Sequence, residues 1–245
     1  MSSLNPITER TIHRQSGDIV IKEFRNSSLE EGQTLGYDFI KKLFLEFAKE
    51  SIRFGKNRYR FVMYPHHYRE RQLSSILIPI LHKLCNGFVM AELPVKRKGT
   101  NTVGWADYWC IYKGYTFIIE VKHSRDLLEI TTIRQNSIIK RWEDMIGQLK
   151  TVVNEVKTFE EKTKGVIRIG LHFISSLSNN GDIDDTRIQK YRDNIDETLT
   201  NFCKVLKPDY SGAWLVPKDS DRNWAGYAFP GVLLMGKVYS PIKHR

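Results

Sequence analysis

The sequence has no apolar run long enough to cross a membrane. The longest apolar-rich stretch, SSILIPILHKLC, is shorter than the ~18 residues that a membrane helix needs, and it contains Pro79. The first residues, MSSLNPITERTIHRQSG, lack the apolar core of a signal peptide. We therefore expect a protein that has no membrane partner.

Cysteine is also scarce, and two well-known catalytic signatures are missing. Cys85, Cys110 and Cys203 are an odd number of cysteines with no CxxC pair, which argues against a disulfide framework or a cysteine zinc site. A reducing, cytoplasmic compartment is the expected location. The chain contains neither a GxSxG elbow nor a phosphate-binding loop that ends in GKS or GKT, so serine hydrolysis and ATP use are not indicated.

What the chain does contain is ordinary globular composition with a basic surplus. It has 245 residues, of which 41% are hydrophobic and 27% charged, as in soluble globular proteins of one large or two small domains. The net charge is +10 and the isoelectric point is about 9.4. Nucleic acid is the commonest partner of such proteins, although a merely soluble basic protein has the same balance.

The periodicity of apolar residues predicts an α/β fold with a central mixed β-sheet flanked by helices. Residues 1–35 are polar apart from DIVIKEF and predict an N-terminal arm or hairpin, while residues 36–245 would form the main domain. Helices are expected over residues 36–55, 68–85, 136–162 and 185–206. Strands are expected over residues 87–95, on both sides of YKGY, and over 165–176, 212–217 and 231–239, with 165–176 central because it is apolar throughout.

The stretch GWADYWCIYKGYTFIIEVKHS, residues 104–124, places charged residues inside what is otherwise a buried hairpin. Glycine at the second position of a Lys113-Gly114 turn suits the positive φ of tight hairpin turns. Counting back from this turn along both strands places Asp107 directly opposite Glu120. Because side chains alternate along a strand, Lys122 would share the face of Glu120.

Two carboxylates that oppose each other in an apolar sheet repel, so something must offset the cost. A divalent cation would do so, because Mg²⁺ prefers carboxylate and phosphate oxygens. The pattern therefore indicates a site that holds Mg²⁺, or Mn²⁺ in its place, against a phosphate. The alternative is an edge strand with solvated acids and a lysine whose ammonium extends to water.

At these residues the chain resembles the PD-(D/E)XK, or restriction-endonuclease-like, nuclease superfamily. The matching pieces are GWAD, which ends at Asp107, and EVK, Glu120 to Lys122; Ala106 stands where many members have proline. The resemblance covers roughly residues 60–180 through the order of elements, and it implies a restriction-endonuclease-like core and metal-dependent hydrolysis of phosphodiester bonds. Asp107, Glu120 and the carbonyl of Val121 would bind metal, and Lys122 would orient the attacking water.

The resemblance also assigns roles outside the hairpin. Glu70 matches an acid that some members aim at the metal from their first helix, although a first-turn glutamate also complements a helix dipole. Glu92 is a weaker acidic candidate. Gln148 matches a glutamine on the helix after the lysine, where the alternative is an ordinary exposed side chain. The pair His66-His67 is expected in a loop, since Mg²⁺ chemistry does not need it.

The basic side chains that are candidates for contacts with nucleic acid are Lys96, Arg97, Lys98, Lys140 and Arg141. The leading function is a metal-dependent endodeoxyribonuclease, with genome (antiviral) defence or a mobile element as its setting. A non-catalytic nucleic-acid-binding subunit of a larger complex is the alternative, and an interaction protein recruited through residues 1–35 is a third class. RNA as substrate and a homodimer or larger nuclease complex stay open.

Overall fold

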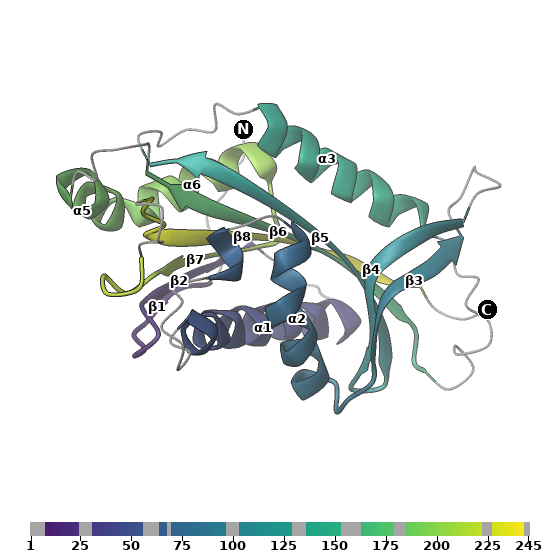
Figure 1. Cartoon of the computed structure of the whole chain (residues 1–245). Coiled ribbons are helices and arrows are strands. Elements are labelled where there is room, and N and C mark those ends of the chain that lie inside the picture. Colours follow the sequence, from purple (N-terminus) through teal and green to yellow (C-terminus); the bar gives the residue numbers. More distant parts are fainter. Residues whose placement is uncertain are drawn as a thin grey trace.

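The fold is built on an eight-stranded mixed sheet with the strand order β1-β2-β7-β8-β6-β5-β4-β3 (Figure 1). A computed structural model describes residues 8–24, 31–55, 64–67, 70–96, 103–128, 136–152, 163–178, 185–221 and 227–242. The strands are β1 (Thr8–Ile12), β2 (Ile19–Glu23), β3 (Val89–Lys96), β4 (Val103–Tyr112), β5 (Tyr115–Leu127), β6 (Val166–Leu177), β7 (Tyr210–Leu215) and β8 (Gly231–Ile242). Of the pairings between them, β5 with β6 is parallel and the rest are antiparallel.

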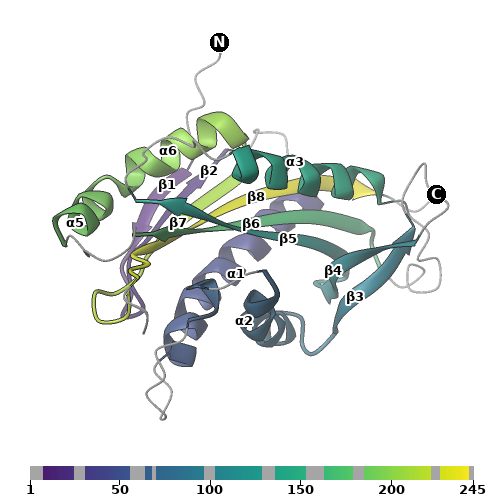
Figure 2. The same cartoon turned by 45° about the horizontal axis from the view of Figure 1, so that its top comes forward.

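Helices cover both faces of the sheet, so the expected α/β class with a mixed sheet and flanking helices is confirmed. On one face lie α1 (Glu31–Gly55), the short 3₁₀ helix η1 (Pro65–His67) and α2 (Glu70–Leu84). On the other face lie α3 (Asn136–Thr151), α5 (Asp185–Asp193) and α6 (Ile195–Leu206), as Figure 2 shows. No helix in the described part of the chain is long and apolar enough to cross a membrane.

The apolar stripes predicted for the first two helices form the largest core. Phe39, Leu43, Phe44 and Phe47 of α1 are buried against the sheet, and so is the stripe of α2 that begins at Leu73. The second helix continues through Pro79 rather than ending there. The third predicted helix is observed as α3, and its predicted continuation over residues 153–162 lies outside the described residues.

Two local expectations needed correction or extension. The single helix predicted over residues 185–206 is wrong, because α5 and α6 are separated at Asn194. The side-chain amide of Asn194 donates to the backbone carbonyl of Lys190 at 2.9 Å, a local bond of the kind by which asparagine competes with helix continuation.

In the N-terminal region, β1 and β2 form a hairpin that joins the sheet through β7, and Ile19 and Ile21 are fully buried.

The predicted β4–β5 hairpin is confirmed over the five residue pairs next to the turn. Tyr112 pairs with Tyr115 across the turn, and the same register continues to Tyr108 opposite Ile119. Lys113 and Gly114 have φ of 49° and 82°, the two positive values that a type I′ turn requires. β6 is central in the sheet, as its apolar sequence predicted, and it pairs with β5 along the full stretch from Thr116 to Leu127.

Candidate functional site

The candidate site lies where β4 separates from β5. Their pairing ends at Tyr108 with Ile119, so Asp107 and Glu120 are the next opposed positions in the same register. The carboxylate of Asp107 there accepts a hydrogen bond from the backbone N–H of Val121, with Oδ2 2.6 Å from the nitrogen. Asp107 thus replaces the backbone hydrogen bond that β4 would otherwise make with the N–H of Val121. Its carboxylate lies at the edge of β5.

Glu120 is 1% exposed, which is rare for a carboxylate. Its neighbour on β6 is Gly170, where α3 comes so close that a Cβ atom would lie 2.7 Å from Cε of Met145 and 2.9 Å from Cδ1 of Leu149. Glycine at this position leaves room for the side chains of Met145 and Leu149 to pack directly on the sheet. The close approach of α3 therefore keeps bulk water away from Glu120.

Glu70 and Lys122 meet around the free edge of β5. The Lys122 ammonium lies 3.8 Å from Oε1 of Glu70, the first residue of α2. The other Glu70 oxygen accepts from the N–H of His123 at 3.3 Å. Beyond Ile119, the N–H groups of Val121 and His123 on β5 have no partner on β4. Acids of the predicted site accept from both of them.

Arg141 of α3 closes the same group from the opposite face of the sheet. Its Nη1 donates to the carbonyl of His123 at 2.8 Å and lies 3.8 Å from Oε2 of Glu70. The sequence suggested Arg141 only as a surface contact for nucleic acid. The structure brings it into direct contact with predicted site residues, and we call Glu70, Asp107, Lys122 and Arg141 the edge cluster.

The strand neighbours of Asp107 form a row of acids. The pairs that flank it on β3 are Ala91 with Tyr108 and Leu93 with Ala106, so Glu92 occupies the position opposite Asp107. Glu92 has a φ of 53°, which is uncommon for a residue other than glycine and often marks a functional or strained position. Glu92, Asp107 and Glu120 therefore occupy one row across β3, β4 and β5.

A tyrosine and a serine that sequence reasoning missed lie next to this row. The hydroxyls of Tyr108 and Ser74 are 2.7 Å apart. Burial raises the pKa of Tyr108 to about 12, and the nearby acids, Asp107 before Glu70 and Glu92, act in the same direction, while the bond to Ser74 opposes it. Tyr108 thus keeps its proton beside the acids. A tyrosine in an aromatic strand gives no sequence signal of such a role.

The remaining predicted site residues are only partly brought together. Gln148 is half-buried on α3, one residue before Leu149, which packs on Gly170. Lys140 is exposed on the same helix. Lys96 ends β3, while Arg97 and Lys98 lie outside the described residues.

Buried histidines continue the polar strand beyond Lys122, a feature that the sequence did not predict. His66 and His67 of η1, expected in a loop, are buried on one side of the sheet. Ser175 Oγ donates to the His66 carbonyl at 2.6 Å and lies 3.0 Å from Nε2 of His123. On the other side, Nε2 of His172 is 2.8 Å from Oγ of Ser124. We call His66, His67, His123 and His172 the histidine cluster.

Burial keeps the histidine cluster neutral. It lowers the pKa of His67 to about 3, of His123 to about 4 and of His172 to about 3, and nearby cationic side chains act in the same direction. The pKa of His66 is also far below its ordinary value, chiefly through burial. The signal in the sequence was the run KHSRD, which continues polar residues through a strand that has a partner only on one side there.

The acids of the site are hard oxygen donors that suit Mg²⁺. No three histidine, cysteine or acidic side chains gather as a metal site within the part of the chain that the structure describes. Mg²⁺, however, is commonly held by one or two carboxylates together with water and a substrate phosphate. The opposed positions of Asp107 and Glu120 fit that smaller requirement.

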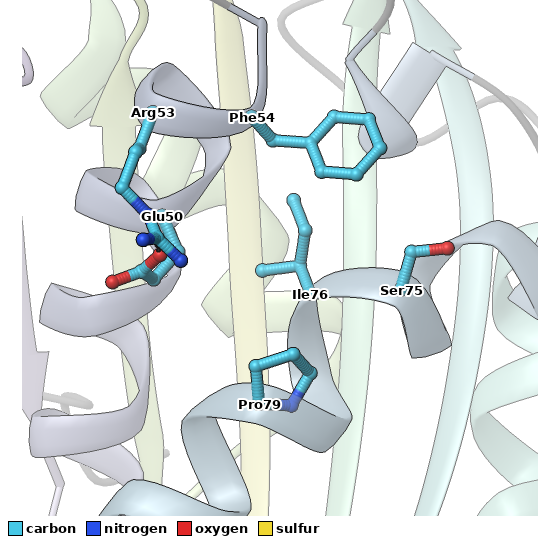
Figure 3. A pocket seen from close by; sticks show the side chains of 6 residues that line it. All are labelled: Glu50, Arg53, Phe54, Ser75, Ile76 and Pro79. Atoms are coloured by element: carbon cyan, nitrogen blue, oxygen red, sulfur yellow. Dashed lines mark hydrogen bonds and ion pairs between the residues drawn. The ribbon is translucent and has the colours of Figure 1, made fainter. Parts of the chain in front are cut away.

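A pocket of about 380 Å³ lies away from these residues, between the end of α1 and the middle of α2 (Figure 3). Its lining residues are Glu50, Arg53, Phe54, Ser75, Ile76 and Pro79. Because proline has no N–H, the carbonyl of Ser75 lacks the usual helix donor. The lining shares no residue with the edge cluster, so this pocket plays no part in the chemistry considered below.

The chain matched no protein-family model, no curated protein and no solved structure.

Proposed function

We propose that the protein is a metal-dependent nuclease that hydrolyses phosphodiester bonds, specifically an endodeoxyribonuclease. The observation that carries the proposal is the β4–β5 register, whose last pair is Tyr108 with Ile119, so that Asp107 and Glu120 are the next positions in the count and Lys122 lies two residues further along β5. Two acids and a lysine at the point where a ladder opens have the residue types that phosphodiester hydrolysis needs. The net charge of +10 suits a polyanionic substrate.

Asp107 and Glu120 would hold Mg²⁺, with the carbonyl of Val121 as the further oxygen that the resemblance implies. When bound, such a metal makes hydroxide available near neutral pH and polarises the phosphate. The Asp107 carboxylate is already oriented by the N–H of Val121. This bond uses one of its two oxygens, and the second carboxylate oxygen is the one that would face a cation.

Lys122 and Arg141 supply the positive charge that a scissile phosphate requires. Lys122 is held near Glu70 across 3.8 Å, a distance that allows its ammonium to turn toward an incoming phosphate or water. Arg141 is fixed by the His123 carbonyl at 2.8 Å. Lysine suits orientation of the attacking water because it is a compact charge whose pKa responds to desolvation. Gln148 would position the nucleic acid.

The proposal is tested by nicking of supercoiled plasmid with Mg²⁺, Mn²⁺, Ca²⁺ or EDTA, alongside linear duplex, single-stranded DNA and RNA. We expect cleavage of DNA with Mg²⁺ or Mn²⁺ and none with EDTA. Glu120→Gln should abolish cleavage, while Asp38→Asn, an exposed acid on α1, should cleave as wild type. Cleavage that is unaffected by EDTA, or by Glu120→Gln, would overturn the proposal.

A non-catalytic nucleic-acid-binding subunit is the second candidate, and one observation favours it. Asp107 and Glu70 both bind backbone N–H groups of β5, so these acids have a structural role without any metal. In that case the purified protein would bind DNA in EDTA and leave plasmid intact under every metal condition. The same plasmid assay therefore separates the two candidates.

A further inference from the structure

The opposite end of the β4–β5 hairpin carries a group of cations that the proposed chemistry does not use. Lys113 lies in the turn itself, Lys42 comes from α1, and Lys164 comes from the segment before β6. All three are exposed. We call Lys42, Lys113 and Lys164 the turn-lysine cluster.

Two tyrosine rings hold the three ammoniums at this turn. Lys42 Nζ donates to the hydroxyl of Tyr112 at 3.1 Å and lies 5.9 Å from the centre of its ring. Lys113 Nζ is 5.6 Å from the same ring centre. Lys164 Nζ is 5.8 Å from the ring centre of Tyr115. Ring contacts at these distances attract cations weakly at exposed sites, so the two rings and the Tyr112 hydroxyl favour positions of the three ammoniums near the turn.

Hydrogen bonds fix the backbone around the cluster. The N–H of Lys164 donates to the Gly114 carbonyl at 2.7 Å, and the N–H of Thr116 donates to the Gly165 carbonyl at 3.0 Å. Lys113 has a φ of 49° in a turn position where asparagine, aspartate or glycine is favoured. A lysine there is a strained choice, and strain in a non-glycine residue is a reason to look for a function.

We propose that the turn-lysine cluster binds phosphates of the DNA backbone away from the cleavage position. Three like charges around one turn repel one another, and a polyanion removes that repulsion. The rings of Tyr112 and Tyr115 are only 6% and 7% exposed, so bases cannot stack on them. The contact is therefore with phosphates and is independent of base sequence.

The distance along β5 suits a duplex that also reaches the edge cluster. From Tyr115 to Lys122 of the edge cluster the strand rises about 23 Å, at about 3.3 Å per residue. This corresponds to about seven base pairs of DNA at about 3.4 Å each. Glu31 is the acid that pairs with Lys164, at 3.6 Å, and it is 74% exposed. An exposed ion pair of this kind contributes little and yields to a phosphate.

The choice of DNA as the partner rests on the proposed function. The experiment distinguishes failure of the phosphate-binding inference from failure of the proposed function. The variant Lys42→Gln/Lys113→Asn/Lys164→Gln removes the three charges, and asparagine suits the positive φ at position 113. The matched control is Lys190→Gln/Lys204→Gln/Lys207→Asn, with Lys190 on α5, Lys204 on α6 and Lys207 directly after α6, where it also has a φ of 49°. Affinity for a fluorescent 24-base-pair duplex is measured by anisotropy in EDTA from 50 to 300 mM NaCl.

We expect the cluster variant to bind DNA at least tenfold more weakly at low salt, with a salt slope about 2.7 smaller in magnitude, since each phosphate contact contributes about 0.9. The control variant should keep the wild-type slope. An unchanged slope in the cluster variant, or an equal loss in the control, would overturn the proposal. So would a loss confined to duplex RNA or to phosphatidylserine vesicles.

Failure of this inference and failure of the proposed function give different results. If wild type nicks plasmid and the cluster variant binds DNA as wild type does, the turn-lysine cluster is not a phosphate surface and the nuclease stands. If wild type never nicks plasmid but the cluster variant shows the smaller salt slope of DNA binding, the phosphate-binding role of the turn-lysine cluster is supported and the nuclease proposal is overturned. Thermal melts of both variants in EDTA exclude unfolding as the cause of weaker binding.

Discussion

The strand β5 carries two polar groups that differ in charge and in access to water. The edge cluster is charged and partly exposed: Glu70 is 34% exposed and Lys122 15%. The histidine cluster begins at the next residue of β5, His123, and its other members lie on η1 and β6; all four are at most 4% exposed and neutral. Adjacent residues of one strand thus belong to opposite electrostatic environments.

The difference shows what a free strand edge permits. At Val121 and His123 the N–H groups of β5 have no partner from β4, and carboxylates accept from them. Charges persist there because water and counter-charges reach the edge. The four imidazoles are at most 4% exposed, and because burial disfavours the charged form of a histidine, they stay neutral. The edge cluster is therefore available for binding, and the histidine cluster serves packing.

The largest effect is expected from removing the ammonium of the edge cluster. Lys122→Ala should reduce plasmid nicking by about 100-fold or more, since positioned groups in proton transfer or charge stabilisation contribute about that much. DNA affinity should change little, because phosphate contacts elsewhere provide most of it. Nicking rates and anisotropy on the same preparations check both statements.

Lys204→Ala, an exposed lysine on α6, is the control for that comparison and should nick as wild type does. Nicking by Lys122→Ala at the wild-type rate would remove the catalytic role from the edge cluster. It would leave the edge cluster with the structural role that its backbone contacts already demonstrate.

The histidine cluster predicts that stability falls with acid. The folded-state pKa of each histidine lies below the unfolded value near 6.5, so the unfolded state takes up more protons below about pH 6.5. Each histidine then adds a slope approaching about 1.4 kcal/mol per pH unit down to its folded pKa. Burial raises the pKa of Asp126 to about 7. Between about pH 4 and 7 Asp126 therefore stabilises the folded state as pH falls, and this offsets the slope contributed by about one histidine.

Urea denaturation between pH 4.5 and 8 measures this slope. His67→Phe should reduce the slope of the unfolding free energy with pH by about the contribution of one histidine. It should not destabilise the protein at pH 8. His67 stacks on Phe229 with ring centres 4.0 Å apart, and its ring nitrogens have no partner among the described residues. The exposed His82 provides the control, and His82→Gln should leave the slope unchanged. A pH-independent wild-type stability would contradict a buried neutral cluster.

Asp107 tests whether the edge cluster is poised for a metal or serves the backbone alone. Asp107→Asn keeps an oxygen for the Val121 N–H and loses the repulsion toward Glu120, so the stability in EDTA should equal or exceed that of wild type. Asp107→Ala leaves the N–H without its acceptor and should cost about 1–3 kcal/mol. Mg²⁺ should stabilise wild type by about 2.7 kcal/mol at a hundred times its dissociation constant, and Asp107→Asn much less.

Thermal melts at fixed ionic strength measure all three proteins. Equal stabilisation of wild type and Asp107→Asn by Mg²⁺ would place the metal elsewhere. A strong loss of stability in Asp107→Asn without metal would make the negative charge itself structural.

The smallest effect is expected from Glu70. Glu70→Gln keeps an acceptor for the N–H of His123, and it loses ion pairs with Lys122 and Arg141 that are each 3.8 Å long. Partly exposed pairs at such distances contribute about 0–1 kcal/mol. Urea denaturation at pH 7.5 should therefore show a change within about 1 kcal/mol. A loss of several kcal/mol would mean that the edge cluster is as tightly coupled as the buried core.

The hairpin and the helices of the first core could be predicted because their signals are local. Period-two alternation and the Lys113-Gly114 turn fix the β4–β5 register. The stripes of α1 and α2 follow the helical period. The break at Asn194 was missed because the apolar period continues across it from Tyr191 to Ile195, and the break is a change of backbone angles at the single residue Asn194 (φ −105°, ψ 17°).

The sequence by itself determined the β4–β5 register as far as the pair of Tyr108 with Ile119, and that Lys122 lies on the same side of β5 as Glu120, because a strand register depends only on counting from its turn. Only the tertiary structure decided that β4 leaves β5 after Tyr108, that Glu70 and Arg141 meet at the exposed edge, and that the histidines are buried. These features join residues that lie far apart in the chain. They depend on how α2, η1 and α3 pack on the sheet, which no local pattern encodes.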